Sequence, residues 1–261
     1  MYPKWRSTRA SVAADVSHAM SSQAAATFPV RIWRGDAGGR FERYDVPRHA
    51  SQTVLDVVTH VQRHVDPSLA YRYACRVGMC GSCAMTVNGK ARWTCRTHVD
   101  TVATDAMLEV APLNNLPIVR DLVVDMAPFF DKWTAAKGAF VPTATRRDDF
   151  ARVEPASKER RAIDTTIECI GCGVCYASCD VVGWKPDYLG PAALNRAWTL
   201  VNDVRDGAGR SRLRAVAADG GCQACHTHQS CTERCPKHLT PTASIAGLKR
   251  RVAGALLKGD L

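Results

Sequence analysis

The chain of 261 residues lacks any uninterrupted run of 18 apolar residues, the length that a membrane-spanning helix requires. Its first residues, MYPKWRSTRASVAADV, contain neither the apolar core nor the cleavage site of a secretory signal. There is also no P-loop, no GxGxxG fingerprint, no nucleophile elbow and no HExxH motif. These absences argue against a membrane span, an export signal and the common classes of nucleotide-binding or hydrolytic enzyme.

Cysteine, by contrast, is abundant: the chain has 12, gathered in three tight groups. A disulfide framework would suit a small exported protein, and this chain is large and shows no export signal. Zinc sites and iron–sulfur clusters remain, because both use thiolates carried on short loops. The spacing within each group therefore has to decide between these two kinds of site.

The first group has the spacing C-x4-C-x2-C-x11-C, which is the plant-type ferredoxin spacing for a [2Fe–2S] cluster. Gly78 and Gly81 lie among its cysteines, where they let the backbone wrap an inorganic core and turn N–H groups toward its sulfurs. Zinc is the alternative, although x4 followed by x2 is an unusual zinc knuckle. The predicted ligands are Cys75, Cys80, Cys83 and Cys95.

The sequence around this loop predicts a small mixed domain. Two strands, Phe28–Trp33 and Arg40–Val46, flank the turn GDAGG, and Asn88-Gly89 predicts a hairpin between Met85–Val87 and Ala91–Trp93. Thr53 and Asp56 form a capping-box pattern before a helix. The apolar face of that helix is predicted at Val54, Leu55, Val57, Val58, Val61 and Val65. Strands, one helix, a cluster loop and a hairpin indicate a β-grasp ferredoxin domain.

The other two groups resemble the paired runs of bacterial ferredoxins, in which the fourth cysteine of each run binds the other cluster. The second group is C-x2-C-x2-C-x3-C, and the third ends in a cysteine followed by Pro236. Exchanging the fourth cysteines predicts a [4Fe–4S] site made of Cys169, Cys172, Cys175 and Cys235. It leaves only Cys179, Cys225 and Cys231 for the other site, which predicts [3Fe–4S].

One missing sulfur underlies the three-iron prediction. His228 stands where a bacterial ferredoxin run carries its second cysteine, so a fourth iron would lack its usual thiolate. Two alternatives stay open: His228 could itself bind iron, or Cys222, three residues before Cys225, could complete a four-iron site. Two zinc sites are a further alternative, but they would need no exchange of ligands between the groups.

The second half of the chain has helical patterns. The predicted helices are Leu122–Lys137, kinked at Pro128, then Pro191–Arg205 and Ser244–Leu257, while Ala144–Arg161 is predicted to be an exposed connection. We therefore expect an α+β protein with a disordered extension over residues 1–27 and the [2Fe–2S] ferredoxin domain over residues 28–115. An all-α, ferredoxin-like domain over residues 116–261 would hold the two cubane-type clusters.

Five segments together resemble the iron–sulfur subunit of succinate dehydrogenase and fumarate reductase. They are CRVGMCGSC, LPIVRDLVVDM, ECIGCGVCYASC, YLGPAALNRAW and CTERCPKHLTP, and the resemblance runs from about residue 28 to residue 258. It implies a subunit that carries electrons between an FAD-containing flavoprotein, where succinate and fumarate interconvert, and quinone at membrane anchor subunits. It also implies a peripheral position on the cytoplasmic face of the bacterial inner membrane, or on the matrix side of the mitochondrial inner membrane.

The expected function is therefore electron transfer within a succinate:quinone or quinol:fumarate oxidoreductase, with the substrate chemistry on another chain. Single-electron clusters suit this role, because a flavin exchanges two electrons with its substrate. The alternative is a ferredoxin-like carrier for another flavin-dependent dehydrogenase. The net charge of +10 does not indicate nucleic acid, because three clusters of about −2 each would reduce it to about +4.

The resemblance also implies two quinone-binding residues, Trp184 and His226. Both side chains can donate a hydrogen bond to a quinone carbonyl, and histidine can also carry protons. The chain departs from the family pattern nearby: Asp180 replaces a usual proline, Gly183 replaces a usual aromatic residue, and Cys222 has no counterpart. These departures bear on the shape of the quinone site more than on the clusters.

Overall fold

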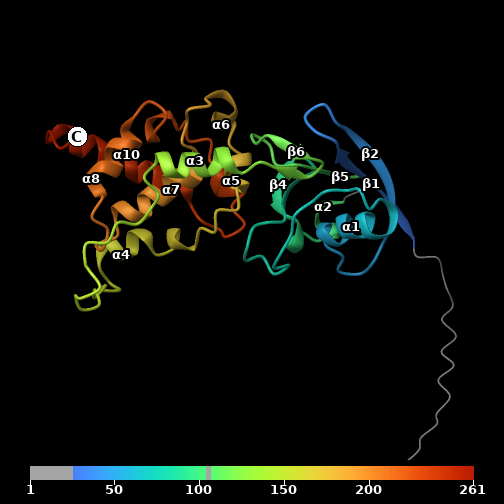
Figure 1. Ribbon diagram of the computed structural model, residues 1–261, viewed down its shortest axis with the longest axis horizontal. Helices are drawn as coiled ribbons and strands as arrows, with labels where there is room; N and C mark the ends of the chain where they lie inside the picture. Colours follow the sequence, from blue (N-terminus) through green and yellow to red (C-terminus); the bar gives the residue numbers. More distant parts are fainter. Residues whose placement is uncertain (1–25, 104–106) are drawn as a thin grey trace, which may run out of the picture.

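The computed structural model describes residues 26–103 and 107–261, so most of the predicted disordered extension lies outside the described residues. Figure 1 shows a sheet with helix α1 at one end of an elongated molecule and a group of helices at the other. The strands are β1 (Thr27–Arg34), β2 (Arg40–Pro47), β3 (Ala84–Val87), β4 (Lys90–Trp93), β5 (Leu108–Ala111), β6 (Ile118–Arg120) and β7 (Val123–Val124). The helices are α1 (Val54–His60), α2 (Val99–Val102), α3 (Ala127–Ala135), α4 (Lys158–Ile163), α5 (Val174–Ala177), α6 (Asp180–Trp184), α7 (Gly190–Val201), α8 (Gly209–Ala217), α9 (Ser230–Glu233) and α10 (Pro241–Leu257), with short turns η1 (Val61–Val65), η2 (Thr94–Arg96), η3 (Thr166–Glu168) and η4 (Cys222–Ala224).

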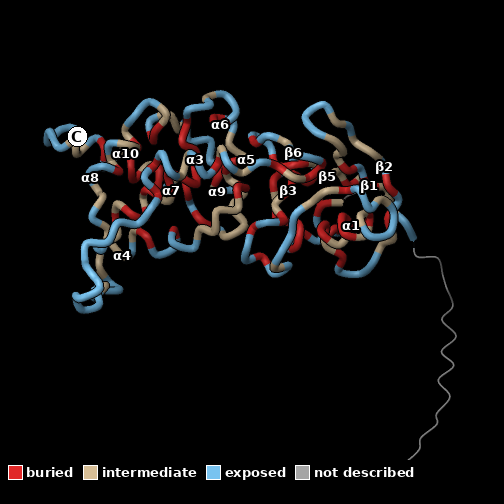
Figure 2. The backbone as a smooth tube through the Cα atoms, viewed as in Figure 1, coloured by how far each residue is buried: buried red, intermediate tan, exposed pale blue. Residues whose placement is uncertain are grey.

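The five-stranded sheet has the order β2-β1-β5-β3-β4, in which β1 and β5 run parallel and the other neighbours run antiparallel. The apolar face of α1 packs on this sheet, and Val57 and Val58 are fully buried against Val30 and Ile32. Figure 2 shows this buried group at the sheet end and another among the helices. The architecture is the predicted α+β fold, a sheet domain followed by helices.

Several local predictions are confirmed. β1 is one residue longer than predicted at both ends, and β2 is one residue longer than predicted at its C-terminal end. Thr53 caps α1, with its hydroxyl accepting from the Asp56 N–H and the Asp56 carboxylate accepting from the Thr53 N–H. Asn88 and Gly89 form the two-residue turn between β3 and β4, both with positive φ (47° and 73°), as this tight hairpin requires.

The predicted apolar face of the first helix is wrong at its last residue, because Val65 is half exposed. The reason is η1, a π-helical turn over Val61–Val65. A π turn contains more residues than an α turn and so rotates the following side chains out of phase with the α-helical repeat. Periodicity that assumes an α-helix therefore places Val65 on the wrong face.

The prediction of one helix over Leu122–Lys137 with a kink at Pro128 is wrong. Its first residues belong to a small antiparallel sheet of β6 and β7, and α3 begins only at Ala127. Pro128 lies in the first turn of α3, where its missing N–H costs nothing, so it starts the helix instead of bending it. This small sheet lies beyond the predicted domain boundary at 115/116, which stays a prediction.

The helical half is organised around α7 and α10. α7 ends at Val201, four residues earlier than predicted, and Asn202 caps it; α10 begins at Pro241. The predicted exposed connection Ala144–Arg161 is largely exposed, although α4 begins within it after its cap Ser157.

A buried ion pair fixes the segment that follows α3. Arg212 and Asp206 have fully buried side chains, and their closest N–O distance is 2.6 Å. The Arg212 guanidinium also donates to the carbonyl oxygens of Lys137 and Ala139. The arginine therefore ties this segment to α8, on which it lies.

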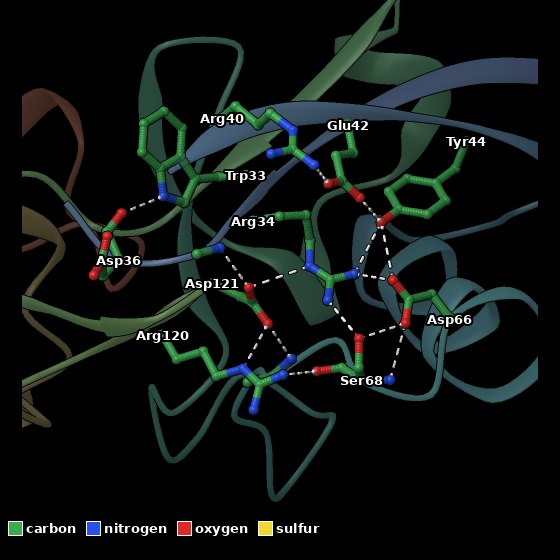
Figure 3. A network of polar contacts seen from close by, with 12 residues as sticks. Trp33, Arg34, Asp36, Arg40, Glu42, Tyr44, Asp66, Ser68, Arg120 and Asp121 are labelled. Atoms are coloured by element: carbon green, nitrogen blue, oxygen red, sulfur yellow. Dashed lines mark hydrogen bonds and ion pairs between the residues drawn. The ribbon is translucent and has the colours of Figure 1, made fainter. Parts of the chain in front are cut away.

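A polar network holds the segment that leads into the first cysteine loop (Figure 3). Arg34 at the end of β1 pairs with Asp66 and with Asp121, and it also donates to the Ser68 hydroxyl. Asp121 is almost completely buried and accepts from the N–H groups of Gly35 and Ala70. The turn between β6 and β7 is thus fastened to the sheet domain, and with it the chain that precedes the cysteine loop.

Candidate metal centres

The first cysteine group is assembled by the β3–β4 hairpin and the loop before it. Cys83 immediately precedes β3, and Cys95 lies in η2 immediately after β4. The hairpin register pairs Ala84 with Trp93, and Thr94 donates to the Cys83 carbonyl through both its N–H and its hydroxyl (3.2 and 2.8 Å). Cys83 and Cys95, which have 11 residues between them in the sequence, therefore lie side by side.

Backbone N–H groups in the loop point at sulfur. The N–H groups of Met79 and Cys80 each lie 3.3 Å from the Cys75 Sγ, and the Cys75 N–H lies 3.5 Å from the Cys80 Sγ. Gly78 and Gly81 make this possible with φ of +73° and +74°, a region that favours glycine. Donors of this kind stabilise thiolates and cluster sulfurs.

The thiols of this loop differ in environment. Hydrogen bonding from Ser82 lowers the pKa of Cys80, which is exposed, to about 6. Burial raises the pKa of Cys95 to about 11. One side of the site is therefore open to solvent or to a partner, and the other side is enclosed by the hairpin. The donor set fits a [2Fe–2S] cluster held by thiolates.

The second predicted ligand set lines one cavity. The lining includes all four of its thiols, together with apolar and small residues such as Ile170, Ala192 and Leu239. Cys169 and Cys172 lie between η3 and α5, Cys175 lies in α5, and Cys235 follows the end of α9, beside Pro236. Burial raises the pKa of Cys172 to about 11 and that of Cys175 well above its ordinary range. Buried thiols of this kind are stabilised as thiolates when they bind a cationic metal centre.

The third predicted set lines a separate cavity. Cys179, Cys225 and Cys231 all border it, and Cys231 Sγ lies 3.4 Å from the Thr242 hydroxyl. The Thr227 N–H donates to the Cys225 Sγ at 3.4 Å. The fourth cysteine of each run thus lies at the cavity of the other run, as the exchange requires.

The shape of these sites bears on the choice of metal. Among the described residues, no group of three or more His, Cys, Asp or Glu side chains converges closely enough to hold a single metal ion. The two buried thiol sets instead surround cavities, an arrangement that suits a multi-iron core whose irons each bind a different thiolate. The two buried thiol sets therefore fit iron–sulfur clusters.

The two candidates for a fourth ligand at the third cavity are placed differently. His228 lines the cavity together with its three thiols. Cys222 is fully buried in η4 and is not among the lining residues. The structure therefore brings the histidine to this site and keeps the additional thiol apart from it.

Of the predicted quinone residues, His226 lines the third cavity and Trp184 lies beside His226. Trp184, at the end of α6, is 65% exposed, and its ring centre is 6.3 Å from that of His226. The His228 ring is even nearer, at 5.7 Å. The sequence analysis considered His228 as a replaced cysteine or an iron ligand and not as a quinone contact, although its position two residues after His226 was a signal for a shared surface. Asp180 in the first turn of α6 also lines this cavity.

Asn115 is a further functional residue that sequence reasoning missed. Its side-chain amide donates to the carbonyl oxygens of Tyr176 and Cys179, each at 3.1 Å. It thereby ties the chain after the sheet domain to the turn that carries a cluster thiol. A Cβ on Gly183 would lie 3.1 Å from the Asn115 Oδ1, which accounts for a small residue at that position.

The two cysteine-bearing halves meet at Gly81. A Cβ built on Gly81 would lie 2.4 Å from the Cβ of Cys172, closer than any side chain allows. The backbone of the first cysteine loop therefore rests directly against a thiol of the second set. This contact brings the two candidate centres together through the backbone of Gly81.

Comparison with known proteins gives two domain matches and several relatives. Residues 29–131 match a 2Fe-2S iron-sulfur cluster binding domain, and residues 165–239 match a 4Fe-4S dicluster domain. The fumarate reductase iron-sulfur subunit of Escherichia coli O157:H7 is 35% identical over 202 residues, which cover 77% of this chain and 82% of the relative. The succinate dehydrogenase iron-sulfur subunit of Paracoccus denitrificans is 32% identical over 234 residues, covering 88% and 89%. A chain of the Mycobacterium smegmatis Sdh1 complex in the apo form superposes with a TM-score of 0.78 at 29% identity, covering 88% of this chain and 97% of that one.

Proposed function

Because this chain belongs to the family of iron–sulfur subunits of fumarate reductases and succinate dehydrogenases, we propose that it passes single electrons between a flavoprotein subunit and membrane quinone. The observation that carries this proposal is the pair of separate thiol cavities, each completed by a cysteine from the other run, with the first cysteine loop in contact with one of them. A row of three centres along one chain is what a relay between distant partners needs.

The proposed ligands follow the three cysteine sets. When bound, the clusters supply one-electron oxidation and reduction, which the amino-acid side chains themselves do not provide. The chain holds each cluster with thiolates, aims N–H donors at their sulfurs and excludes water from the two inner sites. The proposed ligands are Cys75, Cys80, Cys83 and Cys95 for [2Fe–2S], Cys169, Cys172, Cys175 and Cys235 for [4Fe–4S], and Cys179, Cys225 and Cys231 for [3Fe–4S].

The surface around the first loop supports a partner on that side. Val77 and Met79 are each 60% exposed, and Cys80 between them and the hairpin is exposed as well. Exposed apolar side chains next to a redox centre suit a protein interface, because docking removes them from water. We assign this face to the FAD-containing flavoprotein, where succinate and fumarate interconvert.

The opposite end of the relay is assigned to quinone. Trp184 presents an indole N–H, and His226 and His228 present ring nitrogens, all beside the cavity of the three-thiol set. These groups can donate hydrogen bonds to a quinone carbonyl, and the histidines can carry the protons that quinone reduction consumes. Here Trp184 is the proposed donor, and the exposed indole is covered by the anchor in the assembled complex.

Attachment to the membrane is proposed to be indirect. No helix in the described part of the chain is both long and apolar enough to cross a bilayer. We place the subunit on the cytoplasmic face of the bacterial inner membrane, where it is held through anchor subunits. Pure lipid vesicles should bind it much more weakly than membranes that contain the anchors, and equal binding would contradict this arrangement.

Purification together with all partners tests the proposed function. We expect a large flavoprotein to co-purify, roughly nine iron atoms per chain, and bleaching of the cluster absorbance on addition of succinate. A colourless protein with stoichiometric zinc would refute the iron–sulfur assignment. Full iron with no response to succinate, and with a different flavin dehydrogenase attached, would support the ferredoxin-like carrier instead.

A substitution at Trp184 tests the quinone side. Trp184→Leu keeps an apolar side chain and removes the N–H donor, so quinone reduction should fall while succinate still reduces the clusters. Phe150→Leu is the matched control, because Phe150 is a fully exposed aromatic residue away from the thiol cavities. Unchanged quinone reduction in Trp184→Leu would contradict the assignment, whereas equal loss of both activities would indicate a folding defect.

A further inference from the structure

Trp93 is a buried residue with no role in the proposed electron relay. It is the last residue of β4, it is 6% exposed, and its indole N–H has no hydrogen-bond partner among the described residues. A buried polar group without a partner is costly, and such groups occur where a ligand or cofactor supplies the missing partner. The indole therefore needs an acceptor that the amino-acid chain alone does not provide.

The ring of Trp93 bridges the two halves of the molecule. The edge of its six-membered ring lies against Gly78 of the first cysteine loop, where an added Cβ would be 3.1 Å from the ring. β4 itself packs on α5, the helix that carries Cys175. Trp93 shares one buried cluster with Cys83, Cys95 and Cys172.

The N–H lies on the edge of the indole opposite to the one that contacts Gly78. Trp93 pairs with Ala84 in the hairpin, and Gly81, three residues before Ala84, touches Cys172 of the second thiol set. The indole N–H has no hydrogen-bond partner in the described part of the chain, and a neutral thiol would be a weak acceptor for it. A thiolate in a metal cluster carries negative charge and is a much stronger acceptor.

We propose that the Trp93 indole N–H donates a hydrogen bond to the Cys172 thiolate and thereby raises the reduction potential of the second cluster. The direction follows from charge: the reduced cluster carries one more electron, so a donor to its sulfur stabilises the reduced state more than the oxidised one. Trp93 acts here as a positioning and tuning residue. This inference rests on the proposed assignment of Cys172 to the [4Fe–4S] cluster.

The test is a redox titration of the purified complex, followed by electron paramagnetic resonance of the reduced [4Fe–4S] cluster. Trp93→Phe keeps an aromatic ring against Gly78 and removes the N–H. We expect the reduction equilibrium of this cluster to shift up to about tenfold toward the oxidised state, because the shift reflects only the part of the hydrogen-bond energy that differs between the reduced and the oxidised cluster. For a one-electron couple, a tenfold shift is about 59 mV. The potential of the [2Fe–2S] cluster should stay unchanged.

Trp33→Phe is the matched control, because its indole N–H donates to the Asp36 carbonyl in the β1–β2 turn and the residue lies in the other buried cluster. It should leave all potentials unchanged. An unaltered [4Fe–4S] potential in Trp93→Phe, with the signal present, overturns the inference. Absence of any [4Fe–4S] signal in the unmodified complex would instead refute the proposed ligand set, so the two failures are distinguishable.

A measurement on the unmodified chain covers the case in which Trp93→Phe does not assemble its clusters. With tryptophan labelled with ¹⁵N in the indole, pulsed resonance of the reduced [4Fe–4S] cluster should show a ¹⁵N coupling transmitted through the N–H···S contact. The same coupling should persist in labelled Trp33→Phe. Its absence from the unmodified complex would overturn the inference without any substitution at Trp93.

Discussion

Replacing Gly81 with alanine tests the contact on which the relay geometry depends. The new methyl group would start 2.4 Å from the Cys172 Cβ and 2.9 Å from its Cα. Carbon atoms in ordinary contact are about 3.5 to 4.0 Å apart. The loop and the second thiol set would therefore have to separate by roughly 1 to 1.5 Å, which increases the distance an electron must cross.

Gly81→Ala loses stability for two reasons, strain of the left-handed backbone and overpacking against Cys172. A substitution at Gly89 measures the first of them alone. Gly81 has φ of +74°, and an alanine there costs about 1–2 kcal/mol for the left-handed backbone. Gly89, in the β3–β4 turn, has φ of +73° and nothing within 4 Å of an added Cβ, so Gly89→Ala carries the backbone cost alone. Overpacking against Cys172 should add about 1–3 kcal/mol in Gly81→Ala only.

Heating the two variants at one scan rate, with the cluster absorbance as the signal, gives the comparison. At about 2 °C per kcal/mol for a chain of this size, Gly81→Ala should lose its clusters about 2–6 °C below Gly89→Ala. The magnetic interaction between the two reduced clusters should also weaken in Gly81→Ala and stay unchanged in Gly89→Ala. Equal melting of the variants with equal magnetic interaction would refute the close contact of Gly81 with Cys172.

Three further predictions concern the network in Figure 3 and the additional thiol. Arg34→Met leaves the buried Asp121 carboxylate without its cation and should lower the free energy of unfolding in denaturant by about 3 kcal/mol. Arg40→Met, at an exposed pair, should lower it by less than about 0.5 kcal/mol. Equal losses would contradict a structural role for the network. Hydrogen bonding from Ser68, together with Arg34, lowers the pKa of Asp66 to about 2. Its stabilisation is complete above the ordinary carboxyl pKa near 4 and is lost as the pH falls toward 2, so circular-dichroism melts of Asp66→Asn should show a shallower loss of stability over that range than the unmodified chain. Cys222→Ser should leave the resonance signal of the oxidised three-iron cluster unchanged, because Cys222 lies outside that cavity; gain or loss of the signal would make it a ligand.

Local features of the fold were predictable wherever the sequence restricts the backbone by itself. Asn88-Gly89 predicts its turn because both residues tolerate positive φ, and Thr53 predicts a helix start because its hydroxyl can accept a backbone N–H. The small sheet at Ile118–Val124 was not predictable, because strands this short have no stability of their own. Its turn is held by Arg34, 87 residues away from Asp121 along the chain.

For the candidate site too, some features were predictable from the sequence and others depended on the tertiary structure. Cysteine spacing alone predicted the number of thiol sets, their order along the chain and the exchange of ligands between runs, because a cluster accepts only a few loop lengths between its thiolates. Only the tertiary structure decided that Gly81 touches Cys172, that the Trp93 ring packs against Gly78, and that His228 rather than Cys222 borders the third cavity. Each of these juxtapositions depends on how distant segments pack, and packing is a property of the whole chain that no local pattern of residues encodes.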